Sequence, residues 1–331
     1  MKKIAVIGSG SWGTALAVMF DKYGHDTTMW SWQEEEAARL RLQGENKEFL
    51  PGIPIGKTLK ITSFPKEAVA GVEIIVAAVP SKFVRVNMEK FAPFITKEQI
   101  IVNVAKGLED ETLLTLSEVI KSVLPENEVT VLSGPSHAEE VARDIPTACV
   151  IAAENEETAK MLQKEMMNPN FRIYTLTDIV GVELGGALKN IIALAAGMSD
   201  GLGYGDNTKA ALMTRGMAEI ARLGIAMGGK TETFFGLSGM GDLIVTCTSM
   251  HSRNRRAGIL LGQGKKLSET LSEVHMVVEG VNTAKAALEL SRKYNVRMPI
   301  ITEINNVLFH GKDARQAVLE LMARDRKKED I

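Results

Sequence analysis

Cysteine is scarce in this sequence. Only Cys149 and Cys247 occur among 331 residues, which is too few for a disulfide framework and typical of a protein from a reducing cytosol. We therefore expect a cytoplasmic protein. The length allows one large domain or two ordinary ones.

An excess of charge is also lacking. The formal net charge is −2 at pH 7, so no overall electrostatic field draws the chain to nucleic acid or to anionic lipid. No group of His, Cys and Asp residues has the spacing of metal ligands, so we expect no metal. The expected partner is a small molecule, and if the chain associates, we expect a homodimer.

Two apolar stretches resemble targeting or membrane segments. The first, MKKIAVIGSGSWGTALA at residues 1–17, is broken by three glycines, unlike the apolar region of a secretory signal. The second, ELGGALKNIIALAAG at Glu183–Gly197, contains Glu183, Lys189 and Asn190, and ionisable groups are costly at the centre of a bilayer. We therefore expect no membrane span and interpret the second stretch as a buried core helix.

The first half of the chain alternates apolar runs with helical patterns, and the first predicted helix is Trp12–Tyr23. The runs that predict strands are Lys3–Ile7, Asp26–Trp30, Glu73–Val79, Gln99–Val104, Val129–Leu132, Ala148–Ala152 and Arg172–Thr175. Such strands, separated by helices, favour a parallel sheet that is covered on both faces. The later patterns are helical: Ile179–Met198, Lys209–Met227, Arg253–Leu261, Val281–Tyr294 and Pro299–Leu308. The predicted fold is α/β: an N-terminal Rossmann domain with a doubly wound, mostly parallel sheet (residues 1–180), followed by an all-α C-terminal domain (residues 181–331).

A glycine-rich turn, GSGSWG at Gly8–Gly13, follows the first predicted strand and opens the first predicted helix. Gly8 permits the tight turn, Gly10 lets a pyrophosphate approach the backbone, and Gly13 lets the helix pack closely on the sheet. The beginning of the helix supplies free N–H groups for the phosphates. The pattern in this context predicts dinucleotide binding.

The choice between NAD and NADP stays open at this stage. An acid after the second strand binds the ribose 2′-hydroxyl of NAD, whereas an arginine accepts the 2′-phosphate of NADP. Here the residues are Ser31, Trp32 and Gln33, followed by Glu34–Glu36. Ser31 can hydrogen-bond a 2′-phosphate, but three nearby glutamates would repel one.

Two polar stretches follow strands at the edge where ligands of open α/β sheets collect. Lys106 comes after Gln99–Val104, and it is either a cation that faces a ligand or a surface lysine beside a turn. In SGPSHAEE, Ser136 and Glu139 match a capping box and predict the beginning of a helix.

Two further stretches lie in the helical half. Ser252 is a predicted N-cap that places Arg253 and Asn254 in the first turn of a helix. Arginine there opposes the helix dipole, and a bound phosphate would remove the conflict; the alternative is a solvated basic run. GLSGMGD ends in Asp242, which can orient an ammonium or a hydroxyl, although its glycines can also serve only as turns.

Lys189 is the candidate catalytic residue. On a helix its neighbours one turn earlier are Gly185 and Gly186, which suggests that another helix or a ligand approaches closely there. Burial lowers the pKa of an ammonium, and a second cation such as Lys106 lowers it further. An amine with a lowered pKa can accept the proton of an alcohol that loses hydride to a nicotinamide.

Together these motifs resemble the NAD(P)-dependent glycerol-3-phosphate dehydrogenases of the bacterial type. The stretches that carry the resemblance are Gly8–Ala17, Val104–Glu109, Gly134–Val141, Glu183–Gly197, Gly205–Gly216, Gly236–Cys247, Ser252–Gly258 and Val277–Ala284. The family implies reversible reduction of dihydroxyacetone phosphate to sn-glycerol 3-phosphate for phospholipid synthesis, with NADH or NADPH as the cofactor. One departure is that Trp32 and Gln33 stand where bacterial members commonly have a basic residue.

The resemblance also implies roles for individual residues, with Lys189 as the proton acceptor in the oxidation direction. The implied cofactor contacts, with the glycine turn, are Gly8, Gly10, Ser11, Trp12, Gly13, Lys106, Ala138, Arg253, Val277 and Glu279. The expected substrate contacts are Lys106, Gly134, Ser136, Lys189, Asp242, Ser252, Arg253 and Asn254, to which Asn190 and Thr246 add hydrogen bonds. Two alternatives remain: a related two-domain dehydrogenase of a hydroxy acid or sugar acid, and a dinucleotide-sensing protein without turnover.

Overall fold

The structure, a computed structural model, describes residues 1–274, 277–325 and 328–329. It divides into two compact units. The sheet unit consists of Met1–Ala105 and Leu116–Ile179, and the helical unit consists of Lys106–Thr115 and Val180–Ile331. The short segment after β7 therefore belongs with the helices and not with the strand that precedes it.

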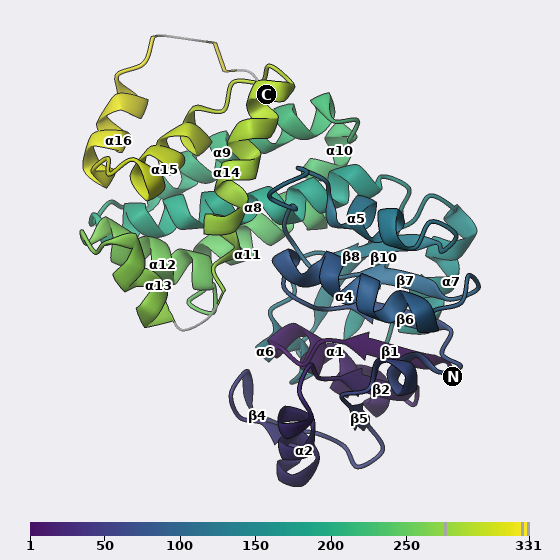
Figure 1. The fold of residues 1–331 in the computed structure, drawn as a ribbon. Helices are drawn as coiled ribbons and strands as arrows, with labels where there is room; N and C mark the ends of the chain where they lie inside the picture. Colours follow the sequence, from purple (N-terminus) through teal and green to yellow (C-terminus); the bar gives the residue numbers. More distant parts are fainter. Residues whose placement is uncertain (275–276, 326–327, 330–331) are drawn as a thin grey trace. The chain divides into compact units, whose positions relative to one another are not determined.

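The sheet unit is built on eight strands in the order β10-β9-β8-β7-β6-β1-β2-β5 (Figure 1). All neighbouring strands are parallel except β8 and β9, which are antiparallel. Their bounds are β1 Lys3–Ile7, β2 Asp26–Trp30, β5 Lys60–Thr62, β6 Ile74–Ala77, β7 Ile100–Asn103, β8 Val129–Ser133, β9 Thr147–Ala152 and β10 Phe171–Leu176. A separate antiparallel pair is formed by β3 Glu45–Asn46 and β4 Leu50–Pro54.

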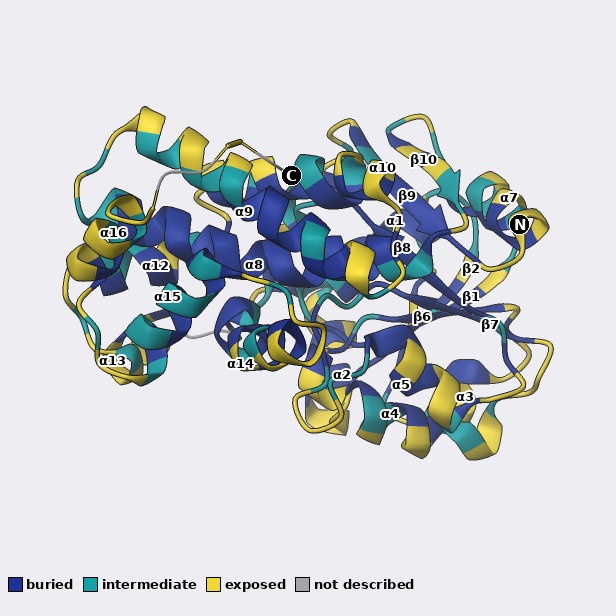
Figure 2. Ribbon diagram, turned by 90° about the horizontal axis from the view of Figure 1, so that it is seen from above, coloured by how far each residue is buried: buried dark blue, intermediate teal, exposed yellow. Residues whose placement is uncertain are grey.

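The apolar runs form strands because both faces of the sheet are covered. Every residue of β6 and of β8 is buried, as expected for a sheet between two helical layers. Figure 2 shows α3, α4 and α5 on one side of the sheet and α1 and α7 on the other. The helices of this unit are α1 Ser11–Lys22, α2 Glu34–Gln43, α3 Pro65–Val69, α4 Val84–Phe91, α5 Leu116–Val123, α6 Ala138–Val141 and α7 Glu156–Met166, with 3₁₀ turns at Ser81–Phe83 and Ala92–Phe94.

The helical unit is arranged around α8, Ile179–Gly201, which is buried over most of its length (Figure 2). On length and composition α8 could cross a membrane, but 89% of its most apolar window is buried inside the structure, as in the core helix of a globular domain. The other helices are α9 Asp206–Ala226, α10 Thr231–Phe234, α11 Asp242–Thr248, α12 Arg253–Gly262, α13 Leu267–Val274, α14 Glu279–Lys293, α15 Pro299–Phe309 and α16 Ala314–Met322, with a π-helical turn, η3, at Leu237–Gly241.

Glycines bring α8 and α12 into backbone contact. A Cβ atom on Gly197 would lie 2.1 Å from the carbonyl oxygen of Arg255, and one on Gly258 would lie 2.1 Å from that of Leu194. Such distances leave no room for a side chain. The two glycines therefore fix Arg255–Gly258 of α12 against Leu194–Gly197 of α8, in the part of α8 that follows Lys189.

The predicted fold class is confirmed: a mostly parallel sheet with helices, followed by a helical region. Every predicted strand is present, and its ends agree to within two residues. The capping box predicted at Ser136 is wrong. The one-turn helix α6 begins at Ala138 with His137 as its N-cap, and the Ser136 hydroxyl instead donates to the carbonyl oxygen of Gly134 at 3.0 Å.

Candidate active site

Lys189 lies inside the helical unit with only 5% of its surface exposed. Its Nζ donates to Oδ1 of Asp242 at 2.6 Å and to Oγ1 of Thr246 at 2.5 Å. Asp242 is the first residue of α11, and Thr246 follows one turn later on the same face. A buried amine needs such partners, because an unpaired buried charge is very costly.

Asp242 also binds a second lysine through its other carboxylate oxygen. Nζ of Lys106 donates to Oδ2 of Asp242 at 2.5 Å. Lys106 belongs to the segment Lys106–Thr115, which groups with the helical unit. One buried carboxylate thus joins two ammonium groups, and Lys189 is the more deeply buried of the two.

The pKa of Lys189 is lowered from 10.5 to about 8. Burial is the main cause, since it disfavours the charged form, and the positive charge of Lys106 acts in the same direction. Asp242 opposes both effects. Burial alone would raise the pKa of Asp242, but Lys106 and Lys189 outweigh burial and lower it. The site therefore holds a permanent carboxylate beside an amine that exchanges its proton near neutral pH.

Gly185 shows why a glycine precedes Lys189 by one turn. A Cβ atom there would lie 3.0 Å from the carbonyl oxygen of Ser238 and 3.2 Å from Cα of Gly239. Both belong to η3, the π-helical turn that leads directly into Asp242. The close approach expected beside Lys189 is therefore made by another backbone segment, the one that carries its carboxylate partner.

The predicted beginning of a helix at Ser252 is confirmed. α12 begins at Arg253, and Oγ of Ser252 accepts from the backbone N–H of Arg255 at 3.2 Å. The first turn of α12 contains no acidic residue. The free backbone N–H groups at this helix end carry partial positive charge, and Arg253 is positively charged. The first turn of α12 is therefore suited to bind an anion.

Buried asparagines tie the beginning of α12 to two other helices. Nδ2 of Asn254 donates to Oδ1 of Asn190 at 2.9 Å, and Oδ1 of Asn254 accepts from the backbone N–H of Gly280 at 2.8 Å. Asn190 is the neighbour of Lys189 on α8, and Gly280 lies in the first turn of α14, which begins at Glu279. These hydrogen bonds therefore fix the position of the first turn of α12 relative to Lys189.

The glycine turn of the sheet unit has the predicted strand–turn–helix context. Gly8 has φ of +120°, and a Cβ there would lie 2.7 Å from the carbonyl oxygen of Ala78. A Cβ on Gly13 would lie 2.1 Å from the carbonyl oxygen of Gly8, so close packing requires glycine at both positions. In contrast, a Cβ on Gly10 would meet nothing within 4 Å, which leaves space for a phosphate at the beginning of α1.

The other predicted contacts of the sheet unit lie near strand ends. Ser11 is the first residue of α1 and donates its hydroxyl to the carbonyl oxygen of Phe49 at 2.6 Å. Gly134 follows β8 directly and has φ of +147°. Ala138 begins α6, and Trp12 is half-buried against the core.

The sequence does not distinguish one buried carboxylate beside the glycine turn, Glu36, from its neighbours Glu34 and Glu35. Glu36 is only 8% exposed. Its Oε1 accepts from the hydroxyl of Ser9 at 3.1 Å, and its Oε2 accepts from that of Ser31 at 2.6 Å. Glu36 is the third of three consecutive glutamates and lies five residues after Ser31. This spacing is only a weak sign in the sequence that Glu36, and not Glu34 or Glu35, is buried.

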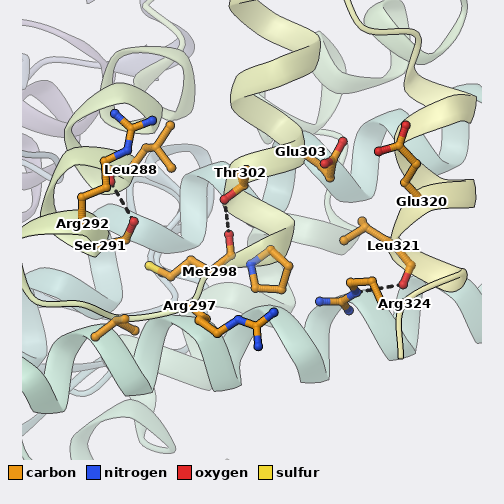
Figure 3. Close-up of a pocket in the computed structure, with 12 residues that line it drawn as sticks. Leu288, Ser291, Arg292, Arg297, Met298, Thr302, Glu303, Glu320, Leu321 and Arg324 are labelled. Carbon is orange, nitrogen blue, oxygen red and sulfur yellow. Dashed lines mark hydrogen bonds between the residues drawn. The ribbon is translucent and has the colours of Figure 1, made fainter. Parts of the chain in front are cut away.

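A cavity of about 460 Å³ lies elsewhere in the helical unit, between α14, α15 and α16 (Figure 3). Its carboxylates, Glu303 and Glu320, are both paired with Lys312. None of the predicted site residues lines it; the lining residues are Leu288, Ser291, Arg292, Val296, Arg297, Met298, Pro299, Thr302, Glu303, Glu320, Leu321 and Arg324. We therefore place the candidate active site at Lys189 and not in this cavity.

Comparison with known proteins places both halves of the chain in one family. The model of the NAD-dependent glycerol-3-phosphate dehydrogenase N-terminus matches residues 3–159, and that of the C-terminus matches residues 178–319. A glycerol-3-phosphate dehydrogenase [NAD(P)+] from Fusobacterium nucleatum subsp. nucleatum is 58% identical, with 99% of each chain covered. The protein of that name from Bacillus subtilis is 51% identical over 98% of this chain and 95% of its own length.

The fold agrees with a solved member of the same family. The crystal structure of glycerol-3-phosphate dehydrogenase from Coxiella burnetii matches with a TM-score of 0.94 at 38% identity, covering 98% of this chain and 99% of that chain. On these grounds, the chain belongs to the NAD-dependent glycerol-3-phosphate dehydrogenase family.

Proposed function

We propose that the chain catalyses the reversible reduction of dihydroxyacetone phosphate to sn-glycerol 3-phosphate, with NADH or NADPH as the cofactor. The product would supply glycerophospholipid synthesis. The curated relatives at 51% and 58% identity support this reaction. The structural observation that carries it is the buried Lys189, held by Asp242 and Thr246 with a pKa of about 8.

Lys189 is the proton carrier of the reaction. In the oxidation direction its neutral amine accepts the proton of the C2 hydroxyl, and in the reduction direction the ammonium returns it to the forming alkoxide. A pKa near the working pH is favourable for both roles. Asp242 remains ionised and orients Nζ of Lys189, while Thr246 fixes the amine from a second direction.

The residues of the glycine turn fit a dinucleotide. When bound, the nicotinamide accepts or donates the hydride. The backbone at Gly10 leaves space for the pyrophosphate, and the first turn of α1 carries no acidic residue that would repel it. By resemblance, Ser11, Trp12, Lys106, Ala138, Arg253, Val277 and Glu279 complete the cofactor contacts.

The phosphate of the substrate is assigned to the beginning of α12. Arg253 can form a bidentate pair with a phosphate, and the N–H groups of the first turn add to it. Asn190 and Asn254 keep this turn in place beside Lys189. Lys106, Gly134, Ser136, Asp242, Thr246 and Ser252 complete the proposed substrate contacts.

Several coarser expectations belong to the same proposal. We propose residues 1–180 as the cofactor domain and residues 181–331 as the substrate and catalytic domain, a cytoplasmic location, and a homodimer. A hydroxy-acid dehydrogenase and a non-catalytic dinucleotide sensor are not favoured, because the curated relatives at 51% and 58% identity carry the glycerol-3-phosphate dehydrogenase name over nearly the whole chain.

The proposed reaction is tested by initial rates of NADH and NADPH oxidation. Dihydroxyacetone phosphate is compared with a panel of 2-keto acids at equal concentration. We expect turnover with dihydroxyacetone phosphate and little with the keto acids, because Arg253 and the turn at α12 suit a phosphate. Faster turnover of a keto acid would show that the substrate assignment is wrong. The absence of turnover with every compound would favour a dinucleotide-sensing protein without catalytic activity.

A further inference from the structure

Glu36 differs from the two glutamates that precede it. All three lie in the first turn of α2, but Glu34 and Glu35 are exposed, whereas Glu36 is only 8% exposed. A buried carboxylate needs hydrogen-bond donors. Glu36 has two, the hydroxyls of Ser9 and Ser31.

These two serines locate the carboxylate on the sheet. Ser9 lies between Gly8 and Gly10 in the glycine turn, and Ser31 follows β2 directly. The two segments are joined by the backbone N–H of Gly8, which donates to the carbonyl oxygen of Trp30 at 3.1 Å. The carboxylate of Glu36 therefore lies where the glycine turn meets the carboxyl end of β2. In Rossmann folds, this is the place of the acid that binds the ribose 2′-hydroxyl.

The serine hydroxyls are committed to Glu36. A serine has one hydroxyl proton, and both Ser9 and Ser31 donate theirs to the carboxylate. Ser31 is thus no donor for a 2′-phosphate in this arrangement. Both hydroxyls present only acceptor lone pairs to a ligand, which disfavour an anion.

The arginines of α2 do not offset this negative site. Arg39 pairs with Glu48 at 2.8 Å. Arg41 binds Glu34 and the carbonyl oxygen of Ile61. Both guanidinium groups are therefore directed to partners other than Glu36.

We propose that Glu36 is a specificity-determining residue that selects NAD(H) over NADP(H). Each oxygen of its carboxylate keeps a lone pair that can accept the 2′-hydroxyl of the adenosine ribose. A 2′-phosphate at the same position would face a buried carboxylate, and both arginines of α2 are paired with other groups. The inference rests on the proposed dinucleotide site, and it assigns a residue to the cofactor choice that the sequence left open.

The test measures the dissociation constants of NADH and NADPH from the change in their fluorescence on binding. We expect the wild-type chain to bind NADH at least about tenfold more tightly, because like charges are strongly unfavourable in a desolvated contact. In a Glu36→Gln variant the ratio should fall toward one, mainly through tighter binding of NADPH. Glu35→Gln removes the same charge from an exposed position one residue away, and it should leave the ratio unchanged.

A measurement on the wild-type chain does not depend on how well the variant folds. NADH that lacks the 2′-hydroxyl of its adenosine ribose should bind several-fold more weakly than NADH, since the acceptor at Glu36 is left without its donor. Equal affinity of the wild type for NADH and NADPH, or a ratio that survives Glu36→Gln in a folded variant, would overturn the role of Glu36. If neither dinucleotide binds, the proposed dinucleotide site itself is wrong.

Discussion

Nζ of Lys189 and Oδ1 of Asp242 are 2.6 Å apart, and the two side chains are only 7% and 3% exposed. The residues are 53 positions apart in the chain. The contact exists because a glycine on α8 admits the π-helical turn that precedes Asp242. Packing between two backbone segments thus creates the environment in which an amine can exchange protons near neutral pH.

Replacing Lys189 by methionine should nearly abolish turnover. The Lys189→Met side chain keeps similar length but cannot carry a proton, so kcat should fall by about 10²–10⁴-fold, the usual contribution of a general acid or base. The measurement is steady-state reduction of dihydroxyacetone phosphate. The control is Lys164→Met on α7, an exposed lysine, which should retain wild-type rates. A Lys189→Met variant with full activity would refute the assignment.

The two charged neighbours of Lys189 should shift its titration in opposite directions. Lys106 lowers the pKa of Lys189 and Asp242 raises it. In the pH profile of kcat/KM, Lys106→Met should therefore move the midpoint above about 8, and Asp242→Asn should move it below. Both variants will be slower, but the midpoint does not depend on the absolute rate. Shifts in the same direction would contradict this account of the site.

The glycine contact between α8 and α12 should be intolerant of a methyl group. A Cβ on Gly258 would lie 2.1 Å from the carbonyl oxygen of Leu194, so Gly258→Ala should lower the free energy of unfolding by about 1–3 kcal/mol. Gly205→Ser is the control, because a Cβ there meets nothing within 4 Å. The midpoints of thermal unfolding are measured for both variants. Equal midpoints for Gly258→Ala and Gly205→Ser would mean that α8 and α12 can move apart to admit the methyl group, and would contradict this prediction.

Glu219 should make stability depend on pH. This carboxyl is 2% exposed, it accepts from the backbone N–H groups of Ile300 and Ile301, and burial raises its pKa from 4.5 to about 7. Between these values the folded chain binds more protons than the unfolded chain, so its contribution to stability falls as the pH rises. The loss amounts to about 3 kcal/mol in total, at about 1.4 kcal/mol per pKa unit.

Comparison with a variant that cannot titrate isolates this effect. As the pH increases from about 5 to about 7.5, the unfolding midpoint of the wild type should fall relative to that of Glu219→Gln. Glu157→Gln, whose side chain is 80% exposed in the native residue, should show no such trend. A difference that stays constant over this range would mean that Glu219 is ionised throughout.

The sheet was predictable from the sequence because its strands are short, apolar and separated by clear breaks. β1 and β2 have the predicted bounds. The edge strand β5 was not predicted, because three residues are too few to show a period. The helix beginning at Arg253 was predictable from one local signal, the N-cap Ser252, whereas the cap predicted at Ser136 failed because α6 begins two residues later.

The candidate site was only partly predictable. The glycines before Lys189 indicated a close approach, and the structure shows that a backbone segment makes it. The sequence offered Lys106 and Asp242 as candidate site residues. It did not show that the carboxylate of Asp242 binds both Lys106 and Lys189. Glu36 was not distinguished from Glu34 and Glu35, because its burial depends on hydroxyls from two separate segments. Such contacts arise from tertiary structure and leave no periodic pattern.

The most direct test of the central claim is the pH dependence of kcat/KM for glycerol 3-phosphate oxidation by the wild-type chain. Oxidation requires the neutral amine of Lys189, so the rate should rise with pH to a plateau with a midpoint of about 8. The reverse reduction should decline over the same range, because it requires the ammonium. An oxidation rate independent of pH through this range, or a midpoint near the ordinary lysine value of 10.5, would contradict the claim that a buried lysine carries the proton.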